Sequence, residues 1–208
     1  MSQRRVRAYI GLGANLGEAE TTLAAAIGAI ADLPAVRLHG VSRLYATKPV
    51  GMVDQPEFRN AVVALDVPAG ADAATGALRL LRQLKGLERA FGRRPGPRWG
   101  PRELDLDLVV FGRARLAIER SPEARSLDAG MDPAKASKLL EVPHPRAAAR
   151  LFVLTPLADL APRLVPPGWG ASVETVRRRR AAIEGPDAVR PLGSWDRIAA
   201  SWRPIQPR

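Results

Sequence analysis

Two aspartates in the middle of the chain alternate with leucines in the run L-D-L-D-L, residues 104–108. This period of two is typical of a β-strand and predicts that Asp105 and Asp107 lie on one face, about 6–7 Å apart. Aspartate disfavours strands, so two of them within an apolar run need a reason. One reason is a strand whose outer face is solvated. The other is a pair of oxygen ligands for a hard cation such as Mg²⁺, whose coordination shell substrate phosphates can complete.

A loop rich in glycine, proline and arginine comes directly before this strand, over residues 92–103. Guanidinium groups bind phosphate oxygens in a fork geometry, and an aromatic ring can stack on a flat heterocycle. The loop supplies both kinds of side chain, namely Arg93, Arg94, Arg98, Arg102 and Trp99. Together with the two carboxylates, these residues predict a site for a nucleoside triphosphate with Mg²⁺, and a transfer of phosphoryl groups.

The composition excludes several other classes of site. The chain has no cysteine, which rules out disulfides and thiolate metal sites, and it has only two histidines, His39 and His144. No run approaches the roughly 20 apolar residues of a membrane span, and no signal peptide is recognisable, so we expect a cytoplasmic protein. The net charge of +11 comes almost entirely from arginine in an alanine-rich chain, which fits a coding bias. We therefore expect no nucleic acid partner.

The apolar periodicity predicts the elements that must hold the two aspartates. Strands are expected at residues 6–12, 37–47, 58–67 and 104–111, and helices at 18–33 and 73–91. The order β-α-β-β-α-β is the split βαβ, or ferredoxin-like, arrangement, which gives an antiparallel sheet with both helices on one face. The fold class is thus α+β. The other face is left for a ligand, lined by Asp105, Asp107 and Asn60.

The segment G-L-G-A-N-L-G follows the first strand. Its glycines are spaced G-x-G-x-x-x-G, which does not match the dinucleotide-binding fingerprint. We interpret Gly11, Gly13 and Gly17 as residues that permit a tight turn from strand to helix, and Asn15 as the helix cap.

The second half of the chain is less regular. A short strand is expected at 116–118, a loop at 119–137, an extended segment around His144 and a helix at 147–160. Residues 1–165 are expected to form the catalytic domain. Residues 166–208 are expected to be an extension packed on that domain, with one short helix at 173–183 in a cover rich in tryptophan and proline.

The motifs, taken in order, resemble the 6-hydroxymethyl-7,8-dihydropterin pyrophosphokinase family. The resemblance covers residues 9–162 and includes Y-I-G-L-G-A-N-L-G, S-R-L-Y-A-T-K-P-V-G, D-Q-P-E-F-R-N-A-V, R-W-G-P-R-E-L-D-L-D and V-P-H-P-R. It implies an enzyme of folate biosynthesis that transfers pyrophosphate from ATP to the pterin hydroxymethyl group and releases AMP. We also expect a monomer.

The resemblance implies a role for each site residue. Asp105 and Asp107 would bind two Mg²⁺ ions and, with Arg93 and Arg102, form the catalytic set. ATP would be held by Lys85, Glu88, Arg93, Arg94, Trp99, Arg102, His144 and Arg150. The pterin would stack between Phe58 and Phe152, and its polar edge would meet Asn60, Asp105 and backbone groups near Thr47 and Val50.

Two other functions remain open from the residues alone. A palm-type nucleotidyl transferase also carries D-x-D on a split βαβ sheet, but it releases pyrophosphate instead of transferring it. A non-catalytic RNA-binding module shares the fold and the basic charge, but it needs exposed aromatic residues on its central strands, where this chain has Asp105 and Asp107.

Overall fold

The computed structural model describes residues 4–49, 51, 54–93, 100–121 and 137–205. Three of the predicted site residues, Val50, Arg94 and Trp99, lie outside this range, as does most of the loop expected at 119–137. Among the described residues, no helix is both long and apolar enough to cross a membrane.

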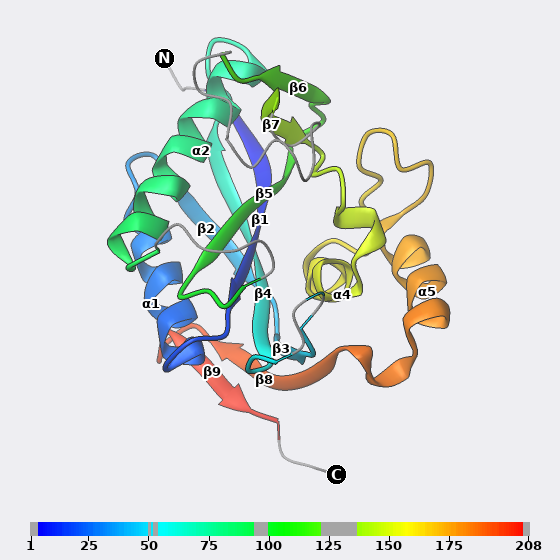
Figure 1. The fold of residues 1–208 in the computed structure, drawn as a ribbon. Coiled ribbons are helices and arrows are strands. Elements are labelled where there is room, and N and C mark those ends of the chain that lie inside the picture. Colours follow the sequence, from blue (N-terminus) through cyan, green and yellow to red (C-terminus); the bar gives the residue numbers. More distant parts are fainter. Residues whose placement is uncertain (1–3, 50, 52–53, 94–99, 122–136, 206–208) are drawn as a thin grey trace.

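The centre of the fold is an antiparallel sheet built around strand β1 (Arg5–Ala14). β1 pairs on one side with β5 (Asp105–Phe111) and on the other with β4 (Phe58–Pro68). Next to β4 lie β2 (Arg37–Val41) and β3 (Leu44–Thr47), both antiparallel to it. With helices α1 (Ala19–Ala31) and α2 (Ala73–Ala90) inserted in chain order, this is the predicted split βαβ arrangement (Figure 1).

The strand predicted at 37–47 is in fact two strands, because Ser42 interrupts the ladder. The Ser42 hydroxyl accepts a hydrogen bond from the Val62 backbone N–H at 2.9 Å and donates one to the Arg43 carbonyl at 2.7 Å. A side chain that bonds the backbone in this way replaces a regular ladder contact.

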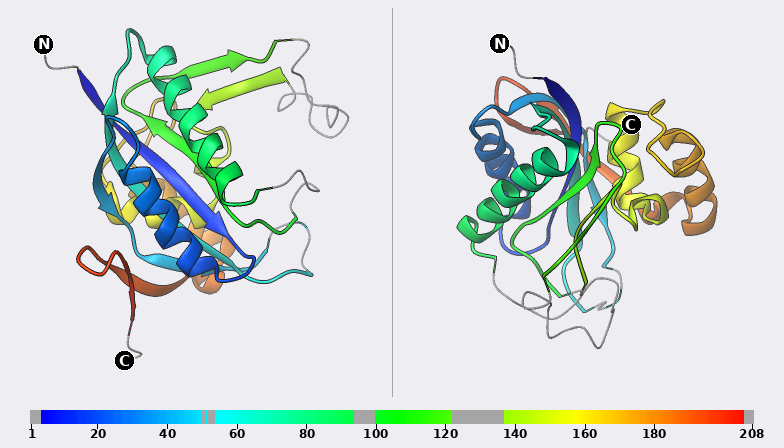
Figure 2. Two further views of the ribbon diagram at one scale, coloured as in Figure 1. Left: turned by 90° about the vertical axis from the view of Figure 1, so that its left-hand side faces the viewer. Right: turned by 90° about the horizontal axis from the view of Figure 1, so that it is seen from above.

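Helices α1 and α2 cover one face of the sheet, as predicted (Figure 2). Their buried side chains, such as Leu23, Ile27 and Leu84, join the sheet residues Leu106 and Leu108 in one hydrophobic core. Because the leucines of the D-x-D strand point into this core, alternation directs Asp105 and Asp107 to the opposite face.

The opposite face is partly covered by helix α4 (Leu151–Leu160), on which α5 (Val173–Glu184) packs (Figure 2). The helix predicted at 147–160 is divided into a 3-10 turn, η3 (Ala147–Ala149), and α4, because Arg150 adopts an extended backbone with φ −130°. Asp159 ties α4 to β3, since its carboxylate accepts a 2.8 Å hydrogen bond from the Tyr45 hydroxyl. Burial, and then the charge of Asp159, raise the pKa of Tyr45 and keep it neutral.

The C-terminal residues contain two strands that the sequence analysis missed. The predicted helix is present as α5, but after the 3-10 turn η4 (Pro186–Ala188) strand β8 (Arg190–Asp196) pairs with β3, and β9 (Ser201–Pro204) pairs with β8. Trp202 is only 4% exposed, and its indole N–H donates to the Ser42 carbonyl at 3.0 Å. The tail therefore extends the main sheet and contributes a core residue.

Two smaller features complete the fold. β6 (Leu116–Glu119), which the sequence predicted, forms a separate hairpin with β7 (Lys138–Val142), which it did not.

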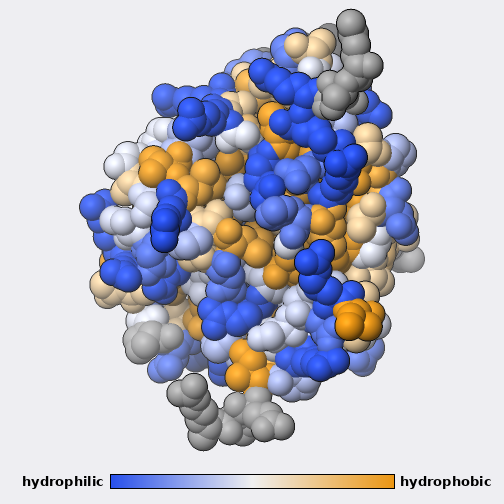
Figure 3. Space-filling model, turned by 180° about the vertical axis from the view of Figure 1, so that it is seen from behind, coloured by the Kyte–Doolittle hydropathy of each residue, from blue (hydrophilic) through white to orange (hydrophobic). Residues whose placement is uncertain are grey.

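On the face opposite to the view of Figure 1, hydrophobic surface occurs in patches between hydrophilic side chains (Figure 3). The most exposed large apolar side chains in the described part of the chain, Val165, Ile183 and Ile198, belong to three different segments.

Candidate active site

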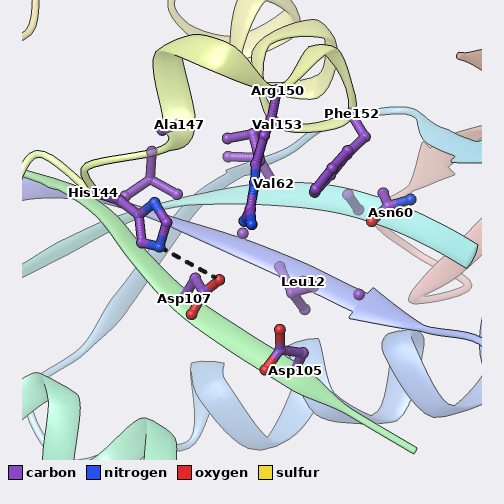
Figure 4. Close-up of a pocket in the computed structure, with 14 residues that line it drawn as sticks. Leu12, Asn60, Val62, Asp105, Asp107, His144, Ala147, Arg150, Phe152 and Val153 are labelled. Atoms are coloured by element: carbon purple, nitrogen blue, oxygen red, sulfur yellow. Dashed lines mark ion pairs between the residues drawn. The ribbon is translucent and has the colours of Figure 1, made fainter. Parts of the chain in front are cut away.

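The two aspartates of β5 lie at the floor of a pocket on the face away from α1 and α2 (Figure 4). The pocket has a volume of about 430 Å³, counted out to open solvent. β1 and β5 form the floor, β4 one wall, and the segment 144–153 the roof. The lining residues are Gly11, Leu12, Gly13, Asn60, Ala61, Val62, Asp105, Asp107, Val109, His144, Ala147, Arg150, Phe152 and Val153.

Two glycines keep this floor open, and our interpretation of them as turn residues was wrong. Gly11 lies opposite Asp107 and Gly13 opposite Asp105 in the β1–β5 ladder. A Cβ at Gly13 would lie 3.3 Å from the Asn60 side-chain oxygen, which is tighter than most real contacts. Of the three glycines in the motif, only Gly17, with φ +54°, serves the turn.

We expect Gly13→Ala to weaken binding of the pterin that the sequence resemblance implies, while the fold stays intact. The backbone of Gly13 is in the strand region, where alanine is tolerated, but its methyl group would project into the pocket beside Asn60. The KM for the pterin should rise by about 10-fold or more, since a misfit of about 1 Å is felt strongly in a preformed site. Steady-state kinetics and a melting curve measure the two effects. Gly86→Ala, a helical position with open space around its Cβ, is the control.

Asp107 is surrounded by positive charge. Its carboxylate lies 4.0 Å from the His144 Nε2, and the Asp107 side chain is 39% exposed toward the pocket. Burial opposes its ionisation, but the charges of His144 and Lys85, followed by those of Arg150 and Arg93, outweigh that effect and hold the pKa of Asp107 below its ordinary value. The side chain is therefore a carboxylate at neutral pH.

His144 is held in place by its own segment. Its backbone N–H donates to the Val109 carbonyl of β5 at 2.9 Å. Its Nδ1 accepts a hydrogen bond from the Arg146 backbone N–H at 3.3 Å, so in the neutral ring the proton is on Nε2. Nε2 is the ring nitrogen 4.0 Å from the Asp107 Oδ2, and His144 thus presents a donor to the pocket.

Arg93 bridges two carboxylates. Its Nη1 donates to the Asp105 Oδ1 at 2.6 Å and also contacts the Glu88 Oε1. Glu88 is only 2% exposed, and the same oxygen accepts hydrogen bonds from the Lys85 Nζ and from the Leu106 backbone N–H, each at 2.7 Å. Lys85 and Glu88 form the pair one turn apart that the sequence indicated, and this pair lies beneath the D-x-D strand.

Arg102 precedes β5 and lies beside the same aspartate. Its Nη1 is 3.8 Å from the Asp105 Oδ1. Neither Arg93 nor Arg102 lines the pocket itself, so both reach it through Asp105.

Asn15 does not cap α1, contrary to our prediction, because Glu18 holds the N-cap position and the Asn15 amide is bonded elsewhere.

Two of the residues predicted to bind the pterin, Asn60 and Phe152, line the other end of the pocket. Asn60 is 6% exposed, and its amide N–H donates to the Thr47 hydroxyl at 2.8 Å. Phe152 lines the pocket, with the Arg150 guanidinium 5.4 Å from its ring centre. Phe58 and Thr47 face each other at the adjoining ends of β4 and β3, but neither is part of the pocket lining.

The donor set of this pocket is small. Among the described residues, no group of three or more histidine, cysteine, aspartate or glutamate side chains could hold a metal ion by itself. Two aspartates on one strand face are instead the pattern of a Mg²⁺ site that shares its ion with substrate phosphates and water.

The fold and this pocket define a class of protein, an α+β domain with two pocket-facing carboxylates on one strand of an antiparallel sheet. Residues 9–162 match the family model described as 7,8-dihydro-6-hydroxymethylpterin-pyrophosphokinase (HPPK). The chain therefore belongs to the 7,8-dihydro-6-hydroxymethylpterin-pyrophosphokinase family, which confirms the resemblance seen in the sequence. Its activity is that of an ATP-dependent pyrophosphokinase in folate biosynthesis, and the palm-type alternative is not needed.

Curated relatives that share one pyrophosphokinase name match most of the chain. The 2-amino-4-hydroxy-6-hydroxymethyldihydropteridine pyrophosphokinase of Pseudomonas aeruginosa is 42% identical over 158 residues, which is 76% of this chain and 82% of that protein. The Bacillus subtilis protein of that name is 36% identical over 153 residues, 74% of this chain and 77% of its own.

Solved structures share the fold. An HPPK-DHPS in complex with substrates aligns with a TM-score of 0.71 at 12% identity, over 100% of this chain and 50% of that one. Wild-type Plasmodium falciparum HPPK-DHPS with pteroate aligns with a TM-score of 0.69 at 12% identity, over 94% of this chain and 47% of that one. The chain thus spans about half of the length of these solved chains.

Proposed function

We propose that the pocket on β5 is where pyrophosphate passes from ATP to 6-hydroxymethyl-7,8-dihydropterin. The hydroxymethyl oxygen attacks the β-phosphorus and loses its proton. The bond from that phosphorus to the oxygen bridging the α- and β-phosphates breaks, and AMP leaves. The observation that carries this assignment is the position of Asp105 and Asp107, side by side at the floor of the pocket and opposite two glycines.

Asp105 and Asp107 are the residues that would hold Mg²⁺, and their chemistry suits that ion. They are hard oxygen donors, and their side chains are 31% and 39% exposed toward the pocket. Oδ1 of Asp105 is bonded to Arg93, which leaves its second oxygen for a ligand. Two bound ions would neutralise charge on the triphosphate and align the reacting groups.

The positive side chains around the aspartates would bind the triphosphate. Arg93 and Arg102 bring guanidinium groups to the Asp105 end, while His144 presents its imidazole and Arg150 its guanidinium from the roof. Burial, and then the like charge of Arg146, lower the pKa of Arg150, so a phosphate beside it would be stabilising. In this proposal Lys85, Arg94 and Trp99 also contact ATP, whereas Glu88 acts by holding Lys85 and Arg93.

The pterin would occupy the Asn60 end. The Asn60 side-chain oxygen, which faces Gly13, would accept from the polar edge of the ring, and Phe152 would stack on one face. Phe58 would cover the other face, with Thr47 and Val50 supplying backbone groups. Aromatic walls with a few placed polar groups suit a flat heterocycle.

Further features of the sequence-based expectation belong to the same proposal. The enzyme acts on these small molecules and not on nucleic acid, as a monomer in the cytoplasm. Residues 1–165 carry the activity, and residues 166–208 pack on that domain, an arrangement supported by the pairing of β8 with β3.

The experiment that tests this proposal identifies the products of the reaction. With ATP, Mg²⁺ and the hydroxymethyl dihydropterin, the protein should form AMP and the pterin diphosphate in equal amounts, and EDTA should abolish both. Separation by anion-exchange chromatography measures them. Release of free pyrophosphate, with the nucleotide attached to the acceptor, would overturn the assignment.

A further inference from the structure

Asn15 is a buried polar residue in the turn between β1 and α1 and has no role in the mechanism above. It is only 4% exposed. Both of its amide hydrogens are donated, one to the Gln55 Oε1 at 2.9 Å and one to the Pro56 carbonyl at 3.0 Å. Its Oδ1 accepts from the Arg102 backbone N–H at 2.8 Å.

The backbone around Asn15 strengthens one of these links. The N–H groups of Asn15 and Leu16 both donate to the Arg102 carbonyl, at 3.0 and 3.3 Å. Arg102 is thus bonded through its N–H and through its carbonyl, and its backbone is fixed relative to the end of β1. Asp105 follows three residues later.

The other link reaches the opposite side of the pocket. Gln55 and Pro56 belong to the segment that enters β4, which carries Phe58 and Asn60. One residue therefore connects the segment before the proposed pterin ligands with the segment before the proposed Mg²⁺ ligand. Gly13, two residues before Asn15, pairs in register with both Asn60 and Asp105, so the three segments converge there.

Asparagine is suited to this position by its chemistry. A carboxamide has two donors and an acceptor on one planar group, whereas alanine would leave the Pro56 carbonyl and the Arg102 N–H without this partner in a part-buried site. Buried polar groups that lose their partners are costly, so the neighbouring segments would shift to recover them.

We propose that Asn15 is a positioning residue that sets the pterin segment 54–60 and the Arg102–Asp105 segment in register with each other. The inference rests on the proposed function of the two ends of the pocket. Its consequence is that loss of the Asn15 amide affects pterin binding and turnover together, although Asn15 touches neither substrate.

The experiment compares variants that remove different links. Asn15→Ala removes all three side-chain hydrogen bonds. Asn15→Asp keeps an acceptor for the Arg102 N–H but loses the donations to Gln55 and Pro56. Of these three hydrogen bonds, Gln55→Ala removes the one to Gln55 and leaves the other two in place. Ser42→Ala is the control, because Ser42 is similarly buried, makes two side-chain hydrogen bonds, and does not itself line the pocket.

For each variant, kcat, the KM values for both substrates and the melting temperature are measured. Asn15→Ala should raise the pterin KM by about 10-fold and lower kcat by about 10-fold, in line with small displacements of reacting groups. Asn15→Asp should raise the pterin KM but keep kcat nearer to that of the wild type. Gln55→Ala should raise the pterin KM several-fold, and Ser42→Ala should change melting temperature but neither kinetic constant by more than about twofold.

The double variant Asn15→Ala/Gln55→Ala separates coupling from general destabilisation. It should be no worse in pterin KM than Asn15→Ala, because the bond between the two residues is already lost. Multiplicative effects, wild-type kinetics in Asn15→Ala, or an equal loss in Ser42→Ala would overturn the proposal. If Asn15→Ala does not fold, Asn15→Asp and Gln55→Ala provide the test: a raised pterin KM supports the proposal, and a wild-type pterin KM overturns it. A wild-type protein that forms no AMP would defeat the proposed function as well, whereas normal Asn15 variants would defeat the coupling alone.

Discussion

Asp107→Asn is expected to lower kcat by about three orders of magnitude while the protein remains folded. Asparagine has nearly the same shape but no charge, so it is a poor ligand for Mg²⁺ and no longer balances the cations around it. A loss of this size corresponds to about 4 kcal/mol of transition-state stabilisation, which is within the range of a metal-centred charge effect. Because the Asp107 side chain faces the pocket and is 39% exposed, little stability should be lost. Single-turnover AMP formation measures the rate.

The matched control for this variant is Asp66→Asn. Asp66 is also a strand carboxylate, 33% exposed, and it pairs with Arg7 at 2.8 Å on the same sheet but outside the pocket. It should retain kcat within about twofold, since surface ion pairs contribute little. A rate in Asp107→Asn within a few-fold of the wild type would remove Asp107 from the proposed metal site.

Glu88→Gln should have the second-largest effect, and it should act on stability as well as rate. The carboxylate accepts from the Leu106 N–H, from Lys85 and from Arg93, and a glutamine would turn an N–H₂ group toward some of these donors. Breaking a buried ion pair lowers the free energy of unfolding by about 3–5 kcal/mol. We expect a loss of about 2–3 kcal/mol in Glu88→Gln, because Lys85 and Arg93 keep some exposure to water. For a chain of this size that is a fall of roughly 5–10 °C in melting temperature.

The rate should also fall in Glu88→Gln, by about 10- to 100-fold, because Arg93 would lose one of the two carboxylates that fix it. Glu174→Gln is the control. Hydrogen bonds from Arg177, followed by Arg178, lower the pKa of Glu174 to about 2, but this pair lies at the surface of α5. The contribution of these ion pairs to the free energy of unfolding is present above the usual glutamate pKa and is lost as the pH falls toward 2. At neutral pH this contribution should be below about 1 kcal/mol. If Glu88→Gln cost no more stability than this control, Glu88 would not be the anchor of Arg93.

Much of the fold follows from local patterns. The alternation of leucine and aspartate at 104–108 gave both the strand and the face of its carboxylates, because a period of two is decided within a few residues. The helical spacing of Leu80, Leu84 and Leu87 located α2 within one residue at each end. Gly92, with φ +89°, follows that helix as predicted.

What could not be predicted depends on partners distant in the sequence. β8 carries Pro191 and Gly193 and has no clear alternation, so its identity as a strand comes from pairing with β3, more than 140 residues earlier. Asn15 looked like a helix cap because its actual partners, Gln55 and Arg102, are 40 and 87 residues away. The burial of Glu88 likewise depends on Arg93 and on the Leu106 N–H, which pack over it only in the folded chain.

The C-terminal strands β8 and β9 form the edge of the sheet beside β3, and they determine which backbone groups this edge exposes to other molecules. β3 has a neighbour on each side, and the outermost strand, β9, is only four residues long and ends at Pro204. Proline has no N–H to donate, and a short border offers few free backbone groups to a passing chain. The tail thereby shields the sheet from unwanted strand addition at high concentration, a protection that a protein ending with α4 would have to obtain in another way.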